Sequence, residues 1–206
     1  MAELPWKPVV HLPANLTVRF DAEVLRAWDP QPWCEGKAAD LLGAGARRGH
    51  VQRLVATLMR YTETLKRLDG RELPSVAALF FWPDFDAQRA TAEVYVLPDD
   101  RADGPMAVAR ARELTAPNKD SQGEPETAEL QVPAGRAFRA HQFRKPRGAL
   151  APDNVTEAVS WFIWPTDSGA TVVITVSWLD RIFSEAGITI ADDMARNFHL
   201  EPLAPA

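Results

Sequence analysis

The strongest local charge signal in this sequence is a basic segment near residue 140. Two phenylalanines, Phe138 and Phe143, are interleaved with it, and no Asp or Glu occurs between positions 136 and 147. Clustered guanidinium and ammonium groups attract phosphate-rich ligands and acidic protein surfaces. We therefore predict a partner-binding or anion-binding site formed by Arg136, Arg139, Arg144, Lys145 and Arg147. The alternative is that the segment pairs with acidic residues of this chain, such as Asp99, Asp100 and Asp103.

Two aspartates, Asp84 and Asp86, follow an apolar segment and form a DxD motif. Carboxylates at such a position act as nucleophiles in haloacid-dehalogenase phosphatases, and they also bind divalent cations when further oxygen ligands are present. Ala87 and Gln88 follow here, and no lysine-containing motif comes later in the chain. We therefore interpret the two aspartates as part of a solvated hairpin loop.

The histidines and the cysteine form no local motif for a metal ion or a nucleophile. None of the histidines has HxH or HxxxH spacing; they are His11, His50, His141 and His199. The single cysteine, Cys34, excludes an intramolecular disulfide and a CxxC motif, and it is typical of a buried thiol. His141 is interpreted as a surface histidine on a strand. No cofactor is expected.

Three glycines, Gly43, Gly45 and Gly49, precede a long helical pattern. A phosphate-binding loop would need a preceding strand and a following GK[ST], and the sequence has neither. The segment is typical of a turn between two helices, where Arg47 and Arg48 could still bind an anion.

Hydrophobic periodicity predicts the elements that must position these residues. Apolar residues at i, i+3 and i+4 spacing predict an amphipathic helix over 51–68 that packs one face on its own core. Segment 76–82 is apolar on both faces and predicts an interior strand. Further strands are predicted at 91–97, 130–132, 135–144, 155–164 and 171–178, an edge strand within 11–20, and helices at 36–42, 105–114, 178–186 and 189–198.

The C-terminal helical region is predicted as two pieces that Gly187 separates. Ser177 with Asp180, and Thr189 with Asp192, fit the pattern in which a Ser or Thr caps a helix and an acid follows three residues later. By contrast, residues 1–35 show no firm secondary structure. Three of the seven tryptophans lie in that Pro-rich segment.

This order of elements predicts an α+β fold. We expect a single antiparallel sheet of about five to seven strands, with helices on one or both faces. Residues 1–206 are expected to form one domain, on which the irregular segment 1–35 packs.

The two predicted hairpins resemble each other in sequence. FFWP at 80–83 matches FIWP at 162–165, and the strand from Ala90 matches the strand from Ala170. Either the chain contains a duplicated hairpin, or Trp-Pro ends a strand in the same way twice by convergence. The match is short, which favours convergence.

Composition narrows the classes of function. The chain has 206 residues and a net charge of −5, which disfavours general nucleic-acid binding because that function needs clustered positive charge. The N-terminal segment does not resemble a signal peptide, and no apolar run approaches the roughly 18 residues that cross a bilayer. We expect a cytoplasmic protein, and its bias toward Arg, Ala and Pro suggests a bacterial source.

The C-terminal region resembles the PsbP-like α/β/α sandwich superfamily. The resemblance covers residues 155–200 and lies in the hairpin VTEAVSWFIWPTDSGATVVITVSW and the closing helix IADDMARNF. It implies a sandwich of a sheet between helices, in a superfamily whose members are mostly non-catalytic binding or assembly proteins. The long helix at 51–68 departs from that family, and no site residue is implied for this chain.

Two hypotheses for the function follow. The first is a non-catalytic protein-interaction, assembly or adaptor module of a bacterial cytoplasmic system, with a protein partner. Its basis is the Trp and Arg content, because both residue types are enriched at interfaces. The second is a small-ligand-binding protein or enzyme whose site is assembled across the sheet from Asp84, Asp86, Arg139 and His141. Those side chains would have to lie within about 10 Å of one another to act together.

Overall fold

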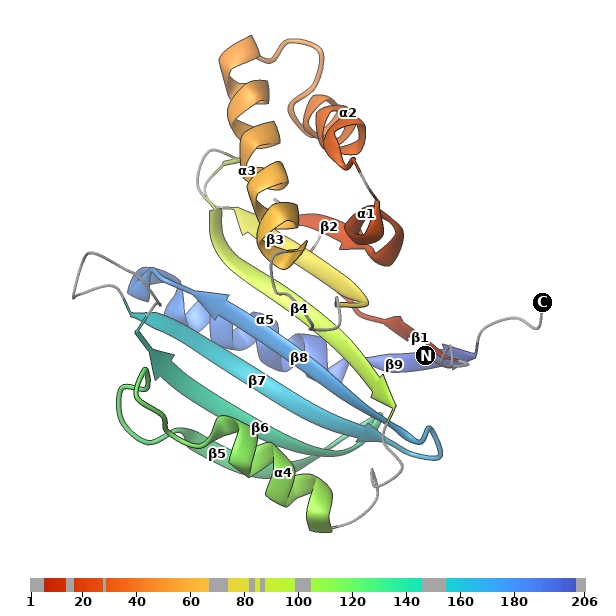
Figure 1. Ribbon diagram of the computed structural model, residues 1–206, viewed down its shortest axis with the longest axis vertical. Coiled ribbons are helices and arrows are strands. Elements are labelled where there is room, and N and C mark those ends of the chain that lie inside the picture. Colours follow the sequence, from red (N-terminus) through yellow and green to blue (C-terminus); the bar gives the residue numbers. More distant parts are fainter. Residues whose placement is uncertain are drawn as a thin grey trace.

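A seven-stranded antiparallel sheet forms the centre of the structure, a computed structural model that describes residues 6–13, 17–27, 29–66, 74–81, 84–85, 88–98, 105–145 and 155–202. The strand order is β2-β3-β4-β8-β7-β6-β5 (Figure 1). The strands are β2 (Thr17–Asp21), β3 (Val76–Phe81), β4 (Gln88–Pro98), β5 (Glu126–Val132), β6 (Gly135–Arg144), β7 (Thr156–Pro165) and β8 (Ala170–Trp178). A second, two-stranded sheet pairs β1 (Trp6–Val9) with β9 (His199–Pro202).

Helices cover both faces of the large sheet, so the predicted α+β class is confirmed. The helices are α1 (Ala22–Arg26), α2 (Gln31–Leu42), α3 (Arg48–Lys66), α4 (Pro105–Thr115) and α5 (Ser184–Arg196), and a 3-10 turn, η1 (Arg181–Phe183), leads into α5. Helix α5 lies behind the sheet in the view of Figure 1, whereas α3 and α4 lie in front of it. We call these two sides the α5 face and the α4 face.

The α5 face carries the largest apolar core. Alternate residues of the central strands point toward α5, because successive side chains of a strand face opposite sides. On β8, which was predicted as a strand over 171–178, these are Val172, Ile174, Val176 and Trp178, and they pack with Met194 and Phe198. All six of these residues are buried.

The α4 face holds two separate apolar clusters rather than one. The first lies between β2–β3 and helices α1, α2 and α3, and it includes Phe20, Leu58 and Leu79. The second lies under α4, where Phe138 and Phe162 contact the helix residues Val108 and Ala111. Strands β4 and β8 run between these two clusters.

Strand β3 is buried on both faces, as its uninterrupted apolar sequence predicts. Val76, Ala78 and Phe80 join the core against α5, whereas Ala77 and Leu79 join the cluster against α3. The amphipathic helix predicted at 51–68 is α3, and its buried stripe closes that second cluster. Cys34 of α2 is fully buried there, and burial raises the pKa of its thiol to about 11, with Asp29 and Glu35 adding to the effect.

The prediction that Gly187 separates two helices is wrong, because α5 runs unbroken through it. A Cβ at this position would lie 2.6 Å from Cε3 of Trp178, so glycine is needed here for close packing rather than as a helix end. The prediction that Ser177 caps a helix is also wrong, because Ser177 lies in β8. Asp180 is itself the N-cap of η1 and accepts a hydrogen bond from the backbone N–H of Ile182 at 3.0 Å. Thr189 does not cap a helix: it lies inside α5, and its hydroxyl donates to the carbonyl of Glu185.

The first thirty-five residues contain more regular structure than the sequence predicts. Strand β2 confirms the edge strand predicted within 11–20, because it forms one edge of the large sheet beside β3. Strand β1, which was not predicted, pairs with β9 near the other end of the chain (Figure 1). Helix α1 and the start of α2 also fall in this segment. Trp33 packs on Phe20 with ring centroids 5.0 Å apart, and Trp28 lies outside the described residues.

The two hairpins lie side by side through β4 and β8, but their registers do not match. Phe80 pairs with Ala90. In the other hairpin Phe162 pairs with Val173, three residues beyond the Ala170 that the sequence match requires. An odd shift turns a side chain to the other face, so Phe80 points toward α5 and Phe162 toward α4. This register favours convergence over duplication.

Candidate functional site

The predicted basic segment is divided between two faces of β6. Arg139 points to the α5 face, because it alternates with Phe138, which contacts α4. Arg136 and Arg144 share the α4 face with Phe138. Lys145 follows the end of the strand, and Arg147 lies outside the described residues, as do Asp99, Asp100 and Asp103. The described members therefore do not form one continuous patch.

Arg139 is part of an internal ion pair. Its Nε lies 2.9 Å from Oδ1 of Asp192 on α5, and only about a fifth of each side chain is exposed. Trp161 donates its indole N–H to the same oxygen at 3.1 Å, and the guanidinium lies 6.0 Å from the Trp161 ring centroid. These contacts tie the sheet to α5.

Arg136 and Arg144 have different partners. Arg136 and Arg112 of α4 both contact the carboxylate of Glu129, at 3.1 and 2.7 Å. Their hydrogen bonds hold the pKa of Glu129 below its usual value. Arg144 donates to the amide oxygen of Gln142 at 2.6 Å, while its buried Nε has no hydrogen-bond partner among the residues that the structure describes.

Asp84 and Arg139 are not brought together. Asp84 follows β3, and Arg139 lies on β6, four strand spacings away across β4, β8 and β7. At 4.7–4.9 Å per spacing this separation is about 19 Å, beyond the reach that a shared site requires. Asp86 lies outside the described residues. The candidate site that combined these residues is therefore not formed around Asp84 and Arg139.

His141 is buried rather than exposed, which corrects its interpretation as a surface histidine. It belongs to a cluster around the buried carboxylate of Glu157 on β7. Oε1 of Glu157 accepts from the hydroxyl of Ser184 at 2.6 Å and contacts Nε2 of His141 at 2.7 Å. Oε2 accepts from the indole of Trp178 at 2.9 Å, and Nδ1 of His141 lies 3.5 Å from Glu126. Because the serine donates to the carboxylate and not to the histidine, the cluster is not arranged as a serine-histidine-acid relay.

A strip of the α4 face remains partly exposed between α3 and α4. In the middle of β4 and β8, the residues that point toward α5 are buried. The residues between them point toward the α4 face, and most of these are half-buried. We call these intervening residues, with Ser160 of β7, the open strip: Thr91, Glu93, Tyr95, Leu97, Ser160, Val173, Thr175 and Ser177.

One end of the open strip, at the start of β4 and the end of β8, is polar. Hydrogen bonds join the hydroxyls of Thr91 and Ser177 at 2.8 Å, and those of Ser160 and Thr175 at 3.1 Å. Glu93 accepts from Tyr95 at 2.8 Å and, at 3.5 Å, from Tyr61 of α3. Burial raises the pKa of Glu93, and these two hydrogen bonds oppose the shift. Burial also raises the pKa of Tyr61 well above its usual value, with a further contribution from Glu93.

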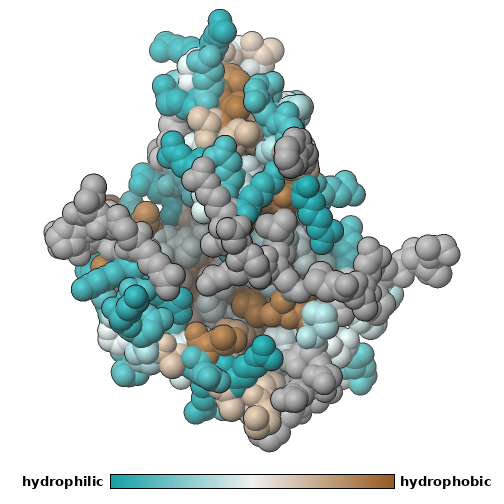
Figure 2. All heavy atoms as spheres, in the orientation of Figure 1, coloured by the Kyte–Doolittle hydropathy of each residue, from teal (hydrophilic) through white to brown (hydrophobic). Residues whose placement is uncertain are grey.

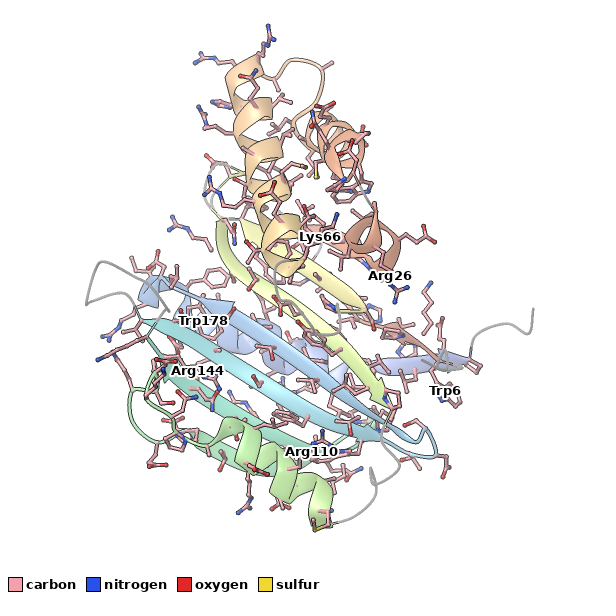
Figure 3. The ribbon with its side chains drawn as sticks, in the orientation of Figure 1. Trp6, Arg26, Lys66, Arg110, Arg144 and Trp178 are labelled. Atoms are coloured by element: carbon pink, nitrogen blue, oxygen red, sulfur yellow. The ribbon has the colours of Figure 1, made fainter. Side chains whose placement is uncertain are left out.

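The half of the open strip next to α4 ends in an apolar pocket. This cavity, the α4 pocket, has a volume of about 70 Å³. Figure 2 shows hydrophobic side chains gathered beside α4 over this part of the sheet, and Figure 3 labels Arg110, which reaches the pocket from α4. Its walls are Leu97, Pro98, Ala107, Arg110, Ala111, Leu114, Phe162, Trp164, Thr171 and Val173.

Two residues at the α4 pocket are unusually placed. Leu114 lines the pocket yet remains 60% exposed, which leaves a large apolar side chain in contact with solvent. Arg110 is exposed, and it makes no ion pair with any residue in the described ranges. An apolar cavity beside an exposed cation can take an aliphatic side chain and a neighbouring carboxylate.

The sequence analysis did not identify Glu157, at the centre of the buried cluster around His141, or Leu114 and Arg110, at the α4 pocket. The alternation Glu157, Val159, Trp161 places Glu157 on the buried face of its strand, and this signal was available. No sequence pattern identifies Leu114 or Arg110 as pocket residues. Both line the pocket because of where α4 lies relative to the end of β4.

No protein family model and no curated protein sequence matches this chain. Among solved structures, LpqN of Mycobacterium tuberculosis, involved in cell envelope biogenesis, is 11% identical, with a TM-score of 0.39 over 62% of this chain and 72% of that one. Protein PA94 of Pseudomonas aeruginosa, of unknown function, is 16% identical, with a TM-score of 0.44 over 67% and 88%. The Ran-binding protein Mog1p of Saccharomyces cerevisiae is 17% identical, with a TM-score of 0.37 over 63% and 82%.

These three structures are α/β folds of the same general kind, and none is described as PsbP-like. Likenesses at these scores carry no functional conclusion. Within the described ranges no helix is both long and apolar enough to span a membrane. In the same part of the chain no group of three or more His, Cys, Asp or Glu side chains is arranged to hold a metal ion.

Proposed function

We propose that this protein is a non-catalytic interaction module that binds a segment of a partner protein along the open strip, with one side chain of the partner in the α4 pocket. The observation that carries the proposal is the α4 pocket itself, where the exposed side chains of Leu114 and Arg110 stand at one cavity. A bacterial, cytoplasmic setting, an adaptor role and a PsbP-like relationship belong to the same proposal.

The pocket indicates the chemistry of the partner. A volume of about 70 Å³ suits one aliphatic side chain, and burial of such a side chain contributes roughly 1.5–3 kcal/mol. Arg110 then favours an Asp or Glu next to that anchor, because guanidinium and carboxylate pair in a bidentate geometry. The chain as a whole carries a net charge of −5 and therefore does not attract acidic partners in general. The preference for an acidic residue comes from Arg110 alone and applies only beside the pocket. We therefore expect an aliphatic anchor with an acidic neighbour.

Affinity capture from the source organism tests this proposal when wild type and variants are compared. Leu114→Arg and Arg110→Glu should each lower the recovery of a stoichiometric partner by about tenfold or more, because both change the pocket. The matched control is Ile182→Arg, since Ile182 is 94% exposed and lies in η1, on a different element. A partner that is retained by both pocket variants, or lost equally with Ile182→Arg, would overturn the proposal.

A further inference from the structure

A second hollow lies where β6 and β7 meet the start of α5, on the other face of the sheet from the α4 pocket. Gln122, Phe143, Glu157, Arg181 and Ser184 line it, and its volume is about 510 Å³. The hollow is a largely open depression, wide enough for an organic molecule to lie in, whereas the smaller α4 pocket is more enclosed and admits a single side chain.

Glu157 supplies a fixed acceptor at this hollow. Ser184 and Trp178 donate to its carboxylate, and Nε2 of His141 contacts it, so that it is held in one orientation. Ser184 and His141 meet Oε1, whereas Trp178 meets Oε2. Because a carboxylate offers about four lone-pair sites, Oε2 can accept a further hydrogen bond. An ammonium group would satisfy it best, since charge-assisted hydrogen bonds are the strongest of this kind.

Arg181 and Phe143 supply complementary chemistry at the same hollow. Arg181 is exposed and lines the hollow, and it makes no ion pair with a residue in the described part of the chain. A guanidinium in this position can pair with a carboxylate. The ring of Phe143 offers an apolar wall, and the amide of Gln122 can donate or accept. A buried anion, an exposed cation and an aromatic surface therefore line one hollow.

We propose that this hollow binds a small amino-acid-like zwitterion. Its ammonium group donates to Oε2 of Glu157, its carboxylate pairs with Arg181, and its hydrocarbon part lies against Phe143. The site is independent of the partner surface proposed at the α4 pocket, because the two share no residue.

Calorimetric titration with three related probes tests the proposed ligand class. L-phenylalanine carries both charges, L-phenylalaninamide lacks the carboxylate, and 3-phenylpropionate lacks the ammonium group. We expect saturable binding of L-phenylalanine, and binding about tenfold weaker or more for each of the other two, because each loses one charge-assisted contact. No saturable binding of L-phenylalanine, or equal binding of all three probes, would overturn the proposal.

Variants assign the binding to this hollow. Arg181→Ala should weaken L-phenylalanine binding by about tenfold, and its exposed position leaves folding intact. The matched control is Arg196→Ala, because Arg196 is an exposed arginine near the other end of α5. Leu114→Arg should leave this binding unchanged, which separates this test from that of the partner surface. Undiminished binding to Arg181→Ala, or an equal loss with Arg196→Ala, would place the probe elsewhere.

Discussion

Glu93, Glu157 and Asp192 each accept hydrogen bonds from side chains on other elements, and in this way they connect the layers of the molecule. Asp192 joins α5 to β6 and β7, Glu157 joins β7 to β8 and to the start of α5, and Glu93 joins β4 to α3. Two of the seven tryptophans, Trp161 and Trp178, donate their indole N–H groups to these acids. Buried tryptophans usually need such a partner, which explains why they meet carboxylates here.

The pKa of Glu93 leads to a test at the residue scale. Its folded-state pKa is raised by burial, so its contribution to stability is present below the unfolded value of about 4.3 and is lost as pH rises through the folded value. Glu93→Gln removes this titration. Relative to the wild type, the variant should therefore gain free energy of unfolding as the pH rises from 4 toward 8, as measured by urea denaturation.

Glu129→Gln is the matched control, because the pKa of Glu129 is shifted the other way. Hydrogen bonds from Arg136 and Arg112 lower it, so Glu129 contributes stability above its unfolded pKa and this contribution is lost as pH falls through the folded value. Relative to the wild type, this variant should therefore lose a small amount of stability as the pH rises toward the unfolded pKa of about 4.3, because the group is exposed, and show no further change up to pH 8. Equal pH slopes for the two variants would contradict the burial of Glu93.

At the scale of elements, the hydrophobic periodicity of the sequence predicts the helices and strands better than single glycine residues predict where they end. The apolar run of β3, the stripe of α3 and the alternation in β8 each predict an element and its buried face, because burial of apolar surface dominates at these positions. The predicted helix break at Gly187 is wrong because a glycine is needed there for contact with Trp178, nine positions earlier in the chain. Its low helix propensity is not the reason for its presence. Information of that kind lies in the packing and is absent from the local sequence.

The close packing of Gly187 on Trp178 predicts the effect of Gly187→Ala. The added Cβ would lie 2.6 Å from the ring of a residue that is only 2% exposed, so the core must shift. We expect a loss of about 1–3 kcal/mol in the free energy of unfolding, as is typical of overpacked cores. Denaturant titration with tryptophan fluorescence measures it.

Gly36→Ala is the matched control for this variant. Gly36 lies inside α2, and no atom of another part of the chain stands within 4 Å of the place that a Cβ would take. Alanine should therefore stabilise the protein by up to about 1 kcal/mol through helix propensity alone. A gain in stability for Gly187→Ala as well would contradict the close contact with Trp178.

At the scale of the whole molecule, the sequence predicts the strands and the class of fold, but not the strand order. The contact of β4 with β8 joins segments about 80 residues apart, and no local pattern specifies that pairing. The same pairing separates the cluster under α3 from the cluster under α4 and leaves the open strip between them. The candidate partner site therefore depends on topology, which explains why no local motif marks it, whereas the basic segment of β6 stands out in the sequence.

Site-specific photo-crosslinking in the source organism tests the proposed partner surface most directly. Benzoylphenylalanine would replace Leu114 at the α4 pocket in one variant and Ile182 in η1 in the other, since both positions are exposed. We predict that position 114 crosslinks to one segment of one partner, at an aliphatic residue beside an Asp or Glu, and that position 182 does not. Absence of a crosslink from position 114, or the same products from both positions, would contradict the proposed partner surface.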